Sequence, residues 1–296
     1  MNEAVGHGKV ILFGEHFVVH GSPAIALGIS SKAIVELEKS DSIQFATDVQ
    51  GTIPELTGKA IANVMGAMSI QDKFKIFLTG DLPTCGGLGS SAAFCVALVR
   101  AFDGYYNMKL SQEEVNKFAF EGEKAFHGNP SGIDNIIATY GGAIEYTKQK
   151  GFKQISIEKP FYLAIGITGC YSPTKKMVEK VHRFKESDEG YFQELYDRAV
   201  DIVKRGRKAL ATGDVKLIGE LMNENHSLLK EIGVSVDLNE EIIRKFLDAG
   251  ALGAKVTGGG GGGCCIALAK DVDHAHKLLK AIKPFDGFVT EVNSTQ

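Results

Sequence analysis

The sequence predicts an α+β protein with two domains. Its 296 residues exceed the roughly 150 residues of a typical single domain. Short β-branched runs separated by turn residues dominate the first third, whereas residues 174–249 have the apolar spacing of amphipathic helices. The pattern changes near residue 155, and we therefore expect one domain over 1–155 and a second over 156–296.

The first domain is expected to combine strands with helices. Apolar residues at helical spacing predict a helix over Leu56–Met68, and a nearly continuous apolar stretch after Ser90 predicts a buried helix. Ser111 and Glu114 form a capping box that opens a further helix, ending near Phe126. The strands expected in this domain are Lys9–Phe13, Phe17–Val19, Ile25–Leu27, Lys73–Leu78 and Ala143–Tyr146.

The second domain is expected to begin with a strand over Phe161–Thr168. The long helical stretch that follows is broken at Asp188, Gly213 and Gly233, because such residues cap or end helices. The last fifty residues predict two strands on either side of six glycines, then a helix and a strand. Their expected ranges are Ala254–Thr257, Cys264–Ala269, Asp273–Lys283 and Phe288–Val292.

Composition excludes several classes of protein. The 33 Lys and Arg residues nearly balance the 36 Asp and Glu residues, so binding to nucleic acid or to an anionic membrane has no electrostatic basis. None of the five cysteines forms a CxxC pair, which is typical of reduced proteins rather than of disulfide frameworks. The one long uncharged stretch, Leu82–Val99, is interrupted by proline and glycine and is unlike a membrane span. We therefore expect a cytoplasmic protein.

The glycines gather in a few stretches, and the first is the loop Pro83–Ser91. Glycine allows backbone N–H groups to turn inward, and the helix that begins near Ser90 adds unpaired N–H groups and the positive end of its dipole. This combination suits a polyphosphate. The loop is not a Walker A motif, because no Gly-Lys-Ser/Thr follows it. The alternative interpretation is a tight strand-to-helix turn needed only for packing.

The second stretch is HGNPSGIDN, residues 127–135. Ser131 and Asp134 have the spacing of an N-cap and its N3 partner, so one interpretation makes Asp134 a helix cap. Glu123 lies at the edge of the apolar stripe of the preceding helix, where a carboxylate is usually solvated. If Glu123 is instead half-buried and faces Asp134, the two carboxylates would suit Mg²⁺ binding and proton acceptance.

The third stretch is the run of six glycines, Gly258–Gly263. It is not a dinucleotide-binding fingerprint, because the β-prone run CCIALA follows it instead of a helix. Ordering six glycines has a large entropic cost. A backbone that closes over a ligand therefore explains the run better than a flexible turn does.

Together, and in this order, these segments resemble the GHMP kinase superfamily over nearly the whole chain. The matching motifs are GKVILFGEHFVVHG, LPTCGGLGSSAA, HGNPSGIDN and KVTGGGGGGCCIAL. GEHFVVHG and GNPSGIDN are most similar to the mevalonate kinase family, whereas a galactokinase would be expected to have Thr-Asp in place of Phe17-Val18. The resemblance implies the two-domain GHMP kinase fold. Its N-terminal βαβ domain is ribosomal-protein-S5-domain-2-like, its C-terminal domain is ferredoxin-like, and the nucleotide lies between them.

The resemblance also implies an activity, the ATP- and Mg²⁺-dependent phosphorylation of (R)-mevalonate at its C5 hydroxyl in isoprenoid precursor biosynthesis. In this assignment Asp134 accepts the hydroxyl proton and Lys9 lies beside it. Glu123 and Ser90 bind Mg²⁺, with Ser91 as the alternative to Ser90. The resemblance places Glu15, His16 and Thr174 at the substrate, and Gly86, Gly87, Leu88, Gly89, Ser90 and Ser91 around the ATP phosphates.

Two other functions remain open at this point. The first is another small-molecule kinase of the superfamily, acting on phosphomevalonate or a sugar. The second is a non-catalytic metabolite sensor of the same fold, which would be expected to lack Asp134, Glu123 or Lys9; all three are present. Many relatives are dimers, so the resemblance also leaves a homodimer open.

Overall fold

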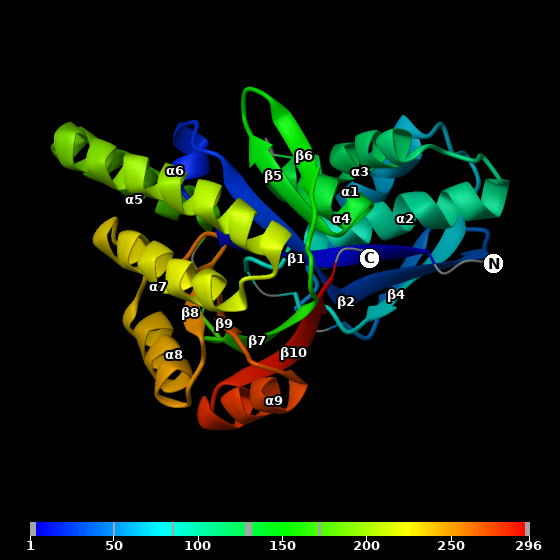
Figure 1. Ribbon diagram of the computed structural model, residues 1–296. Helices are drawn as coiled ribbons and strands as arrows, with labels where there is room; N and C mark the ends of the chain where they lie inside the picture. The colour runs from blue at the N-terminus through cyan, green and yellow to red at the C-terminus, as the bar shows by residue number, and fades with distance from the viewer. Residues whose placement is uncertain (1–3, 50, 85, 128–131, 171–172, 294–296) are drawn as a thin grey trace.

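The computed structural model describes residues 4–49, 51–84, 86–127, 132–170 and 173–293. Within these residues the chain forms two β-sheets, each covered by helices (Figure 1). The strands of the first sheet all lie between Val5 and Ile155, and those of the second between Phe161 and Val292. The expected α+β class is therefore confirmed.

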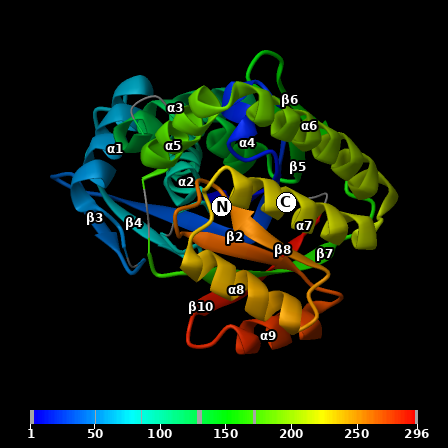
Figure 2. The same ribbon diagram turned by 90° about the vertical axis from the view of Figure 1, so that its left-hand side faces the viewer.

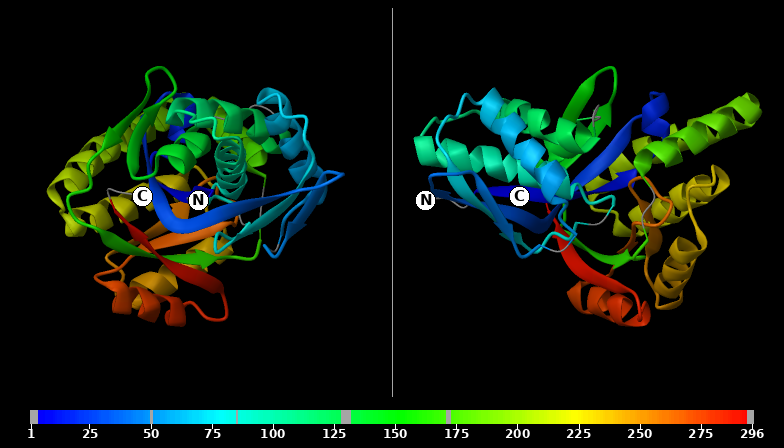
Figure 3. Two further views of the ribbon diagram at one scale, coloured as in Figure 1. Left: turned by 90° about the vertical axis from the view of Figure 1, so that its right-hand side faces the viewer. Right: turned by 180° about the vertical axis from the view of Figure 1, so that it is seen from behind.

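The first sheet is organised around one long strand, β2 (Ala24–Lys39), which pairs antiparallel with β1, β4 and β5. Helices α2 and α4 pack on β1 and β2, and α1 and α3 lie outside them (Figure 3). The other elements are β1 (Val5–Phe13), β3 (Gln44–Thr47), α1 (Pro54–Ala67), β4 (Phe74–Gly80), α2 (Ser90–Tyr106), α3 (Gln112–His127), α4 (Ile133–Tyr140), β5 (Ala143–Thr147) and β6 (Gly151–Ile155).

The second sheet is antiparallel, with the strand order β10-β7-β9-β8. Helices α8 and α9 cover the face that points away from the first sheet (Figure 2). The helical stretch breaks where predicted, since Asp188 caps α6 by accepting the N–H of Tyr191 and Gly213 ends α6 with φ 65°. The elements are β7 (Phe161–Ile167), α5 (Thr174–Ser187), α6 (Glu189–Thr212), α7 (Val215–Glu231), α8 (Asp237–Asp248), β8 (Gly253–Thr257), β9 (Cys264–Leu268), α9 (Val272–Ala281) and β10 (Asp286–Val292).

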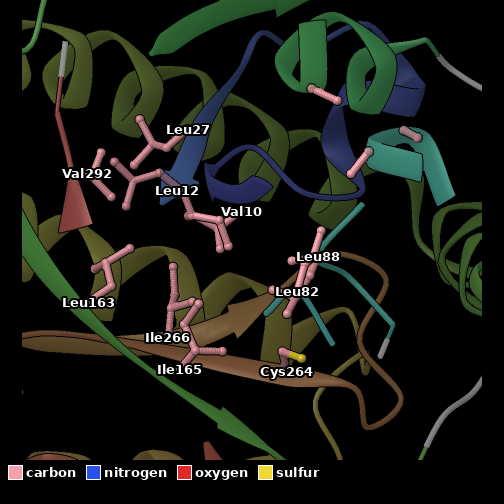
Figure 4. Close-up of a cluster of buried hydrophobic side chains, with 14 of the residues drawn as sticks. Val10, Leu12, Leu27, Leu82, Leu88, Leu163, Ile165, Cys264, Ile266 and Val292 are labelled. Carbon is pink, nitrogen blue, oxygen red and sulfur yellow. The ribbon is translucent and has the colours of Figure 1, made fainter. Parts of the chain in front are cut away.

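A hydrophobic core joins the two sheets. In Figure 4, Val10 and Leu12 of β1 face Ile165 of β7 and Ile266 of β9, and all four side chains are fully buried. Burying each such side chain contributes about 1.5–3 kcal/mol. Because alternate residues of a strand point to opposite faces, this core places Lys9 on the other face of β1, toward α2 and α4.

Three local predictions differ from the structure. Phe17–Val19, expected as a strand, forms part of the 3₁₀ helix η1 (Phe17–His20), because His16 before it turns the chain with φ 62°. Strands β3 and β6 were not expected, since most of their residues are not buried and the apolar alternation is weak.

Among the described residues, no helix has both the length and the apolar character needed to cross a membrane.

Candidate active site

The site is built around an ion pair between the first strand and the fourth helix. Lys9 on β1 is only 4% exposed, and its Nζ lies 3.1 Å from Oδ1 of Asp134 in the first turn of α4. The N-cap of α4 is Gly132, so Asp134 lies at the second position of the helix and not at the predicted third. Its proposed partner Ser131 lies outside the described residues. Asp134 is therefore free to face Lys9, with 29% of its side chain exposed.

The glycine loop before α2 lies directly over this ion pair. Leu88 is fully buried in the core (Figure 4), and its carbonyl accepts the backbone N–H of Lys9 at 2.9 Å. Gly89 adopts φ 69°, and a Cβ there would lie 2.9 Å from Cγ of Lys9 and 3.7 Å from Oδ2 of Asp134. Only glycine allows this approach. Since α2 begins at Ser90, the positive end of its dipole faces the Lys9–Asp134 pair.

A second carboxylate lies next to the pair. Glu123 on α3 is 1% exposed, so the solvated interpretation is wrong, and Ser91 Oγ donates to its Oε1 at 2.7 Å. His127 Nε2 is 3.3 Å from the same oxygen. Burial, and then the charge of Asp134, raise the pKa of Glu123 to about 8, while the Ser91 hydrogen bond opposes that rise. Its Oε2 is buried and has no hydrogen-bond partner among the described residues.

These groups fit a bound Mg²⁺. The orphaned Oε2 of Glu123 is a buried oxygen without a donor, and the neighbouring Ser91 hydroxyl offers a second hard ligand. The structure favours Ser91 over Ser90 here, because the hydroxyl of Ser90 donates to the carbonyl of Pro83 at 2.6 Å instead. In the described part of the chain no three His, Cys, Asp or Glu side chains cluster as a metal cage. Mg²⁺ sites do not need one, since phosphates and water supply most of their ligands.

The six-glycine run packs against the glycine loop before α2 through backbone atoms. A Cβ on Gly87 would lie 2.9 Å from the carbonyl oxygen of Thr257, and a Cβ on Gly258 would lie 2.6 Å from Cα of Gly87. Likewise, a Cβ on Gly263 would lie 2.9 Å from the carbonyl oxygen of Gly86. The run is thus packed along residues 86–87 of the glycine loop, and this packing favours a backbone that lines a site over an unpacked turn.

The remaining substrate-site candidates lie around this glycine run. Nε2 of His16 is 3.0 Å from the carbonyl oxygen of Gly259, and burial lowers the pKa of His16 to about 4, so its ring is neutral at pH 7. Thr174, the first residue of α5, meets the same glycine, because a Cβ on Gly259 would lie 2.9 Å from its Oγ1. Glu15 is 1% exposed and is bound by Lys255.

Two residues of this region were not predicted from the sequence to lie near the site. Lys255 of β8 is fully buried and pairs with Glu15, 240 residues away in the chain. Asn239 of α8 is also fully buried; its Nδ2 donates to the carbonyl of Gly262 at 3.0 Å, and its Oδ1 accepts the N–H of that glycine at 3.1 Å. Both lie within ordinary strand or helix patterns, so only the tertiary fold reveals their roles.

Comparisons with known proteins agree with this geometry. Residues 55–142 match the GHMP kinases N terminal domain, and residues 207–286 match the GHMP kinases C terminal domain. The mevalonate kinase of Thermococcus sibiricus is 34% identical over 294 residues, covering 89% of this chain and 87% of that protein.

Solved structures show the same relationship over nearly the full chain. The crystal structure of L. major mevalonate kinase in complex with R-mevalonate is 38% identical with a TM-score of 0.95, covering 99% of this chain and 96% of that one. The Methanococcus jannaschii mevalonate kinase structure is 26% identical with a TM-score of 0.84, covering 99% and 98%. The expected two-domain GHMP kinase fold is thereby confirmed. The chain belongs to the mevalonate kinase family of the GHMP kinases.

Proposed function

We propose that this protein transfers the γ-phosphoryl group of ATP, with Mg²⁺, to the C5 hydroxyl of (R)-mevalonate. The observation that carries the proposal is the Lys9–Asp134 pair at 3.1 Å, held beneath Gly89 at the start of α2. Phosphoryl transfer needs a positioned nucleophile next to a site that neutralises phosphate charge. The family relationship supports the choice of substrate, since a solved relative at 38% identity binds R-mevalonate.

Different residues would position the hydroxyl and neutralise the charge of the phosphates. Asp134 is partly exposed and can accept the proton of a hydroxyl placed against it, while the Lys9 ammonium favours the oxygen as negative charge develops. The backbone from Gly86 to Gly89 and the first turn of α2 offer N–H groups to the phosphates. Glu123 and Ser91 would hold Mg²⁺, which when bound neutralises charge on the β- and γ-phosphates.

The substrate side is assigned to the buried residues after β1. His16 is neutral and bonded to the six-glycine run, so it orients a substrate without attracting its carboxylate by charge. Thr174, the exposed first residue of α5, also lies beside Gly259. Oε2 of Glu15 is buried and has no hydrogen-bond partner among the described residues. A substrate hydroxyl would reach that oxygen only after the neighbouring side chains move.

The test is a panel of alcohols incubated with the purified protein, ATP and Mg²⁺. We expect ADP release only with mevalonate and a single phosphomonoester product by ³¹P NMR, with Asp134→Asn as the inactive control. Turnover of phosphomevalonate or galactose in place of mevalonate would assign the protein to another GHMP activity. Tight mevalonate binding without ADP release would indicate a sensor.

A further inference from the structure

A threonine of the second sheet bonds the strand that carries Lys9. Thr257, the last residue of β8, is 1% exposed. Its hydroxyl accepts the backbone N–H of Ile11 at 2.9 Å and donates to the carbonyl of the same residue at 3.1 Å. Because a hydroxyl has one proton to donate and lone pairs that accept, this single side chain binds both polar backbone groups of Ile11. Thr257 thereby makes the hydrogen bonds that a neighbouring strand would make in a sheet.

These bonds lie on the edge of β1 that also contacts the glycine loop. Residues two apart in a strand point their N–H groups to the same edge, so Lys9 and Ile11 share one. On that edge the N–H of Lys9 reaches the carbonyl of Leu88 at 2.9 Å, and the N–H of Ile11 reaches Thr257. The opposite edge of β1 pairs with β2. The stretch from Lys9 to Ile11 is therefore held by the loop at one end and by β8 at the other.

The main chain of Thr257 touches the glycine loop as well. A Cβ on Gly87 would lie 2.9 Å from the carbonyl oxygen of Thr257, so the two backbones meet without room for a side chain. Gly87 directly precedes Leu88, whose carbonyl binds Lys9. Three contacts therefore join β1, the glycine loop and β8 in a closed ring. Because the ring is closed, the loss of one contact allows β1 and the loop to shift relative to each other.

We propose that Thr257 is a positioning residue for phosphoryl transfer: its hydroxyl holds β1 at the distance from the glycine loop at which Lys9 meets Asp134. This inference rests on the proposed function for the roles of Lys9 and Asp134. Without the hydroxyl, the N–H of Ile11 becomes a buried donor that has lost its partner, which is strongly unfavourable. The strand then moves until this N–H finds another acceptor. Lys9 moves with it, since it lies two residues away.

The experiment compares Thr257→Val with Thr257→Ser in steady-state turnover. Valine has nearly the shape of threonine but no hydroxyl, whereas serine keeps the hydroxyl. Since a misplacement of about 1 Å lowers rates about 100-fold, we expect Thr257→Val to lower kcat at least about 10-fold. Thr257→Ser should keep kcat within about threefold of the wild-type value, because Oγ can still bond both groups of Ile11. A folded Thr257→Val variant with wild-type kcat would overturn the inference.

Thr290→Val is the matched control for a general loss of stability. Thr290 of β10 is also 1% exposed, and its hydroxyl likewise joins the two sheets, because Oγ1 accepts the N–H of Ser30 on β2 at 3.0 Å. Neither residue belongs to the proposed site. Both valine variants should melt at a lower temperature than the wild type, but Thr290→Val should keep the wild-type kcat. An equal fall of kcat in both variants would contradict a positioning role, since lost stability alone would then explain it.

A readout without turnover separates this inference from the proposed function. The backbone amide of Lys9, followed by hydrogen exchange in ¹H–¹⁵N NMR spectra, should exchange at least about tenfold faster in Thr257→Val than in Thr290→Val, because its bond to Leu88 opens locally. Equal protection of this amide in the two variants overturns the inference whether or not the protein phosphorylates mevalonate. If Thr257→Val does not fold, Thr257→Ala, which also lacks the hydroxyl, replaces it in both comparisons.

Discussion

Replacing Gly89 with alanine tests how closely the glycine loop must approach the Lys9–Asp134 pair. The new Cβ would lie 2.9 Å from Cγ of Lys9, whereas ordinary contact begins at 3.4 Å, so Lys9 or the loop must retreat by at least about 0.5 Å. A misplacement of about 1 Å lowers rates about 100-fold, and we therefore expect kcat to fall between about 10- and 100-fold. The left-handed φ of 69° adds about 1–2 kcal/mol of backbone strain.

The assay is steady-state turnover together with thermal unfolding, and Gly58→Ala is the matched control. Gly58 is an exposed residue of α1, and a Cβ there would meet nothing within 4 Å. In a helix interior this change stabilises by about 0.5–1 kcal/mol, so Gly58→Ala should melt higher with normal kcat. The reasoning is refuted if Gly89→Ala keeps wild-type kcat and melting temperature.

The other predictions concern single groups of the site. Asp134→Asn should lower kcat by about 10²–10⁴ in the ADP-release assay, and near-normal turnover would exclude it as the base. Glu123→Gln should raise the Mg²⁺ concentration needed for half-maximal activity, since the amide cannot ionise to a charged ligand as the carboxyl can; an unchanged titration would contradict the ligand assignment. For His16, the pKa falls from 6.5 to about 4 on folding, so the unfolded chain binds the extra proton and stability decreases as pH falls from about 6.5 to 4. The full effect is about 3 kcal/mol, and urea unfolding of His16→Gln should show a correspondingly smaller pH-dependent loss than wild type; parallel curves for the two proteins would argue against a buried neutral His16.

The elements that could be predicted from the sequence are those with a strong local signal. The capping box is confirmed, because the backbone N–H of Glu114 reaches Oγ of Ser111 at 3.3 Å and the N–H of Ser111 reaches Oε2 of Glu114 at 2.8 Å. The helix breaks at Asp188, Gly213 and Gly233 could also be predicted, because helix-capping residues and glycine affect only the few residues next to them. In contrast, the 3₁₀ helix η1 depends on the positive φ of His16, and the pattern of apolar residues does not predict that backbone angle.

The site was predictable as a set of motifs but not as a set of contacts. Choosing between Ser90 and Ser91 required the rotation of α2 relative to α3, which alone decides that Ser91 faces Glu123. The burial of Glu123 depends on the packing of α3 against α2, and position on a helical stripe indicates this only in part. Lys255 was hidden because its partner is distant in the chain.

The contact between Gly86–Gly87 and the six-glycine run has a mechanical consequence. Among the described residues, the nearest approaches there are between main-chain atoms, which have no side-chain rotamers to absorb a displacement. A displacement of Gly86 or Gly87 would be passed directly to β8 and β9, the strands that flank the glycine run. The second sheet would therefore respond to a shift of this loop without the slack that a side-chain interface would provide.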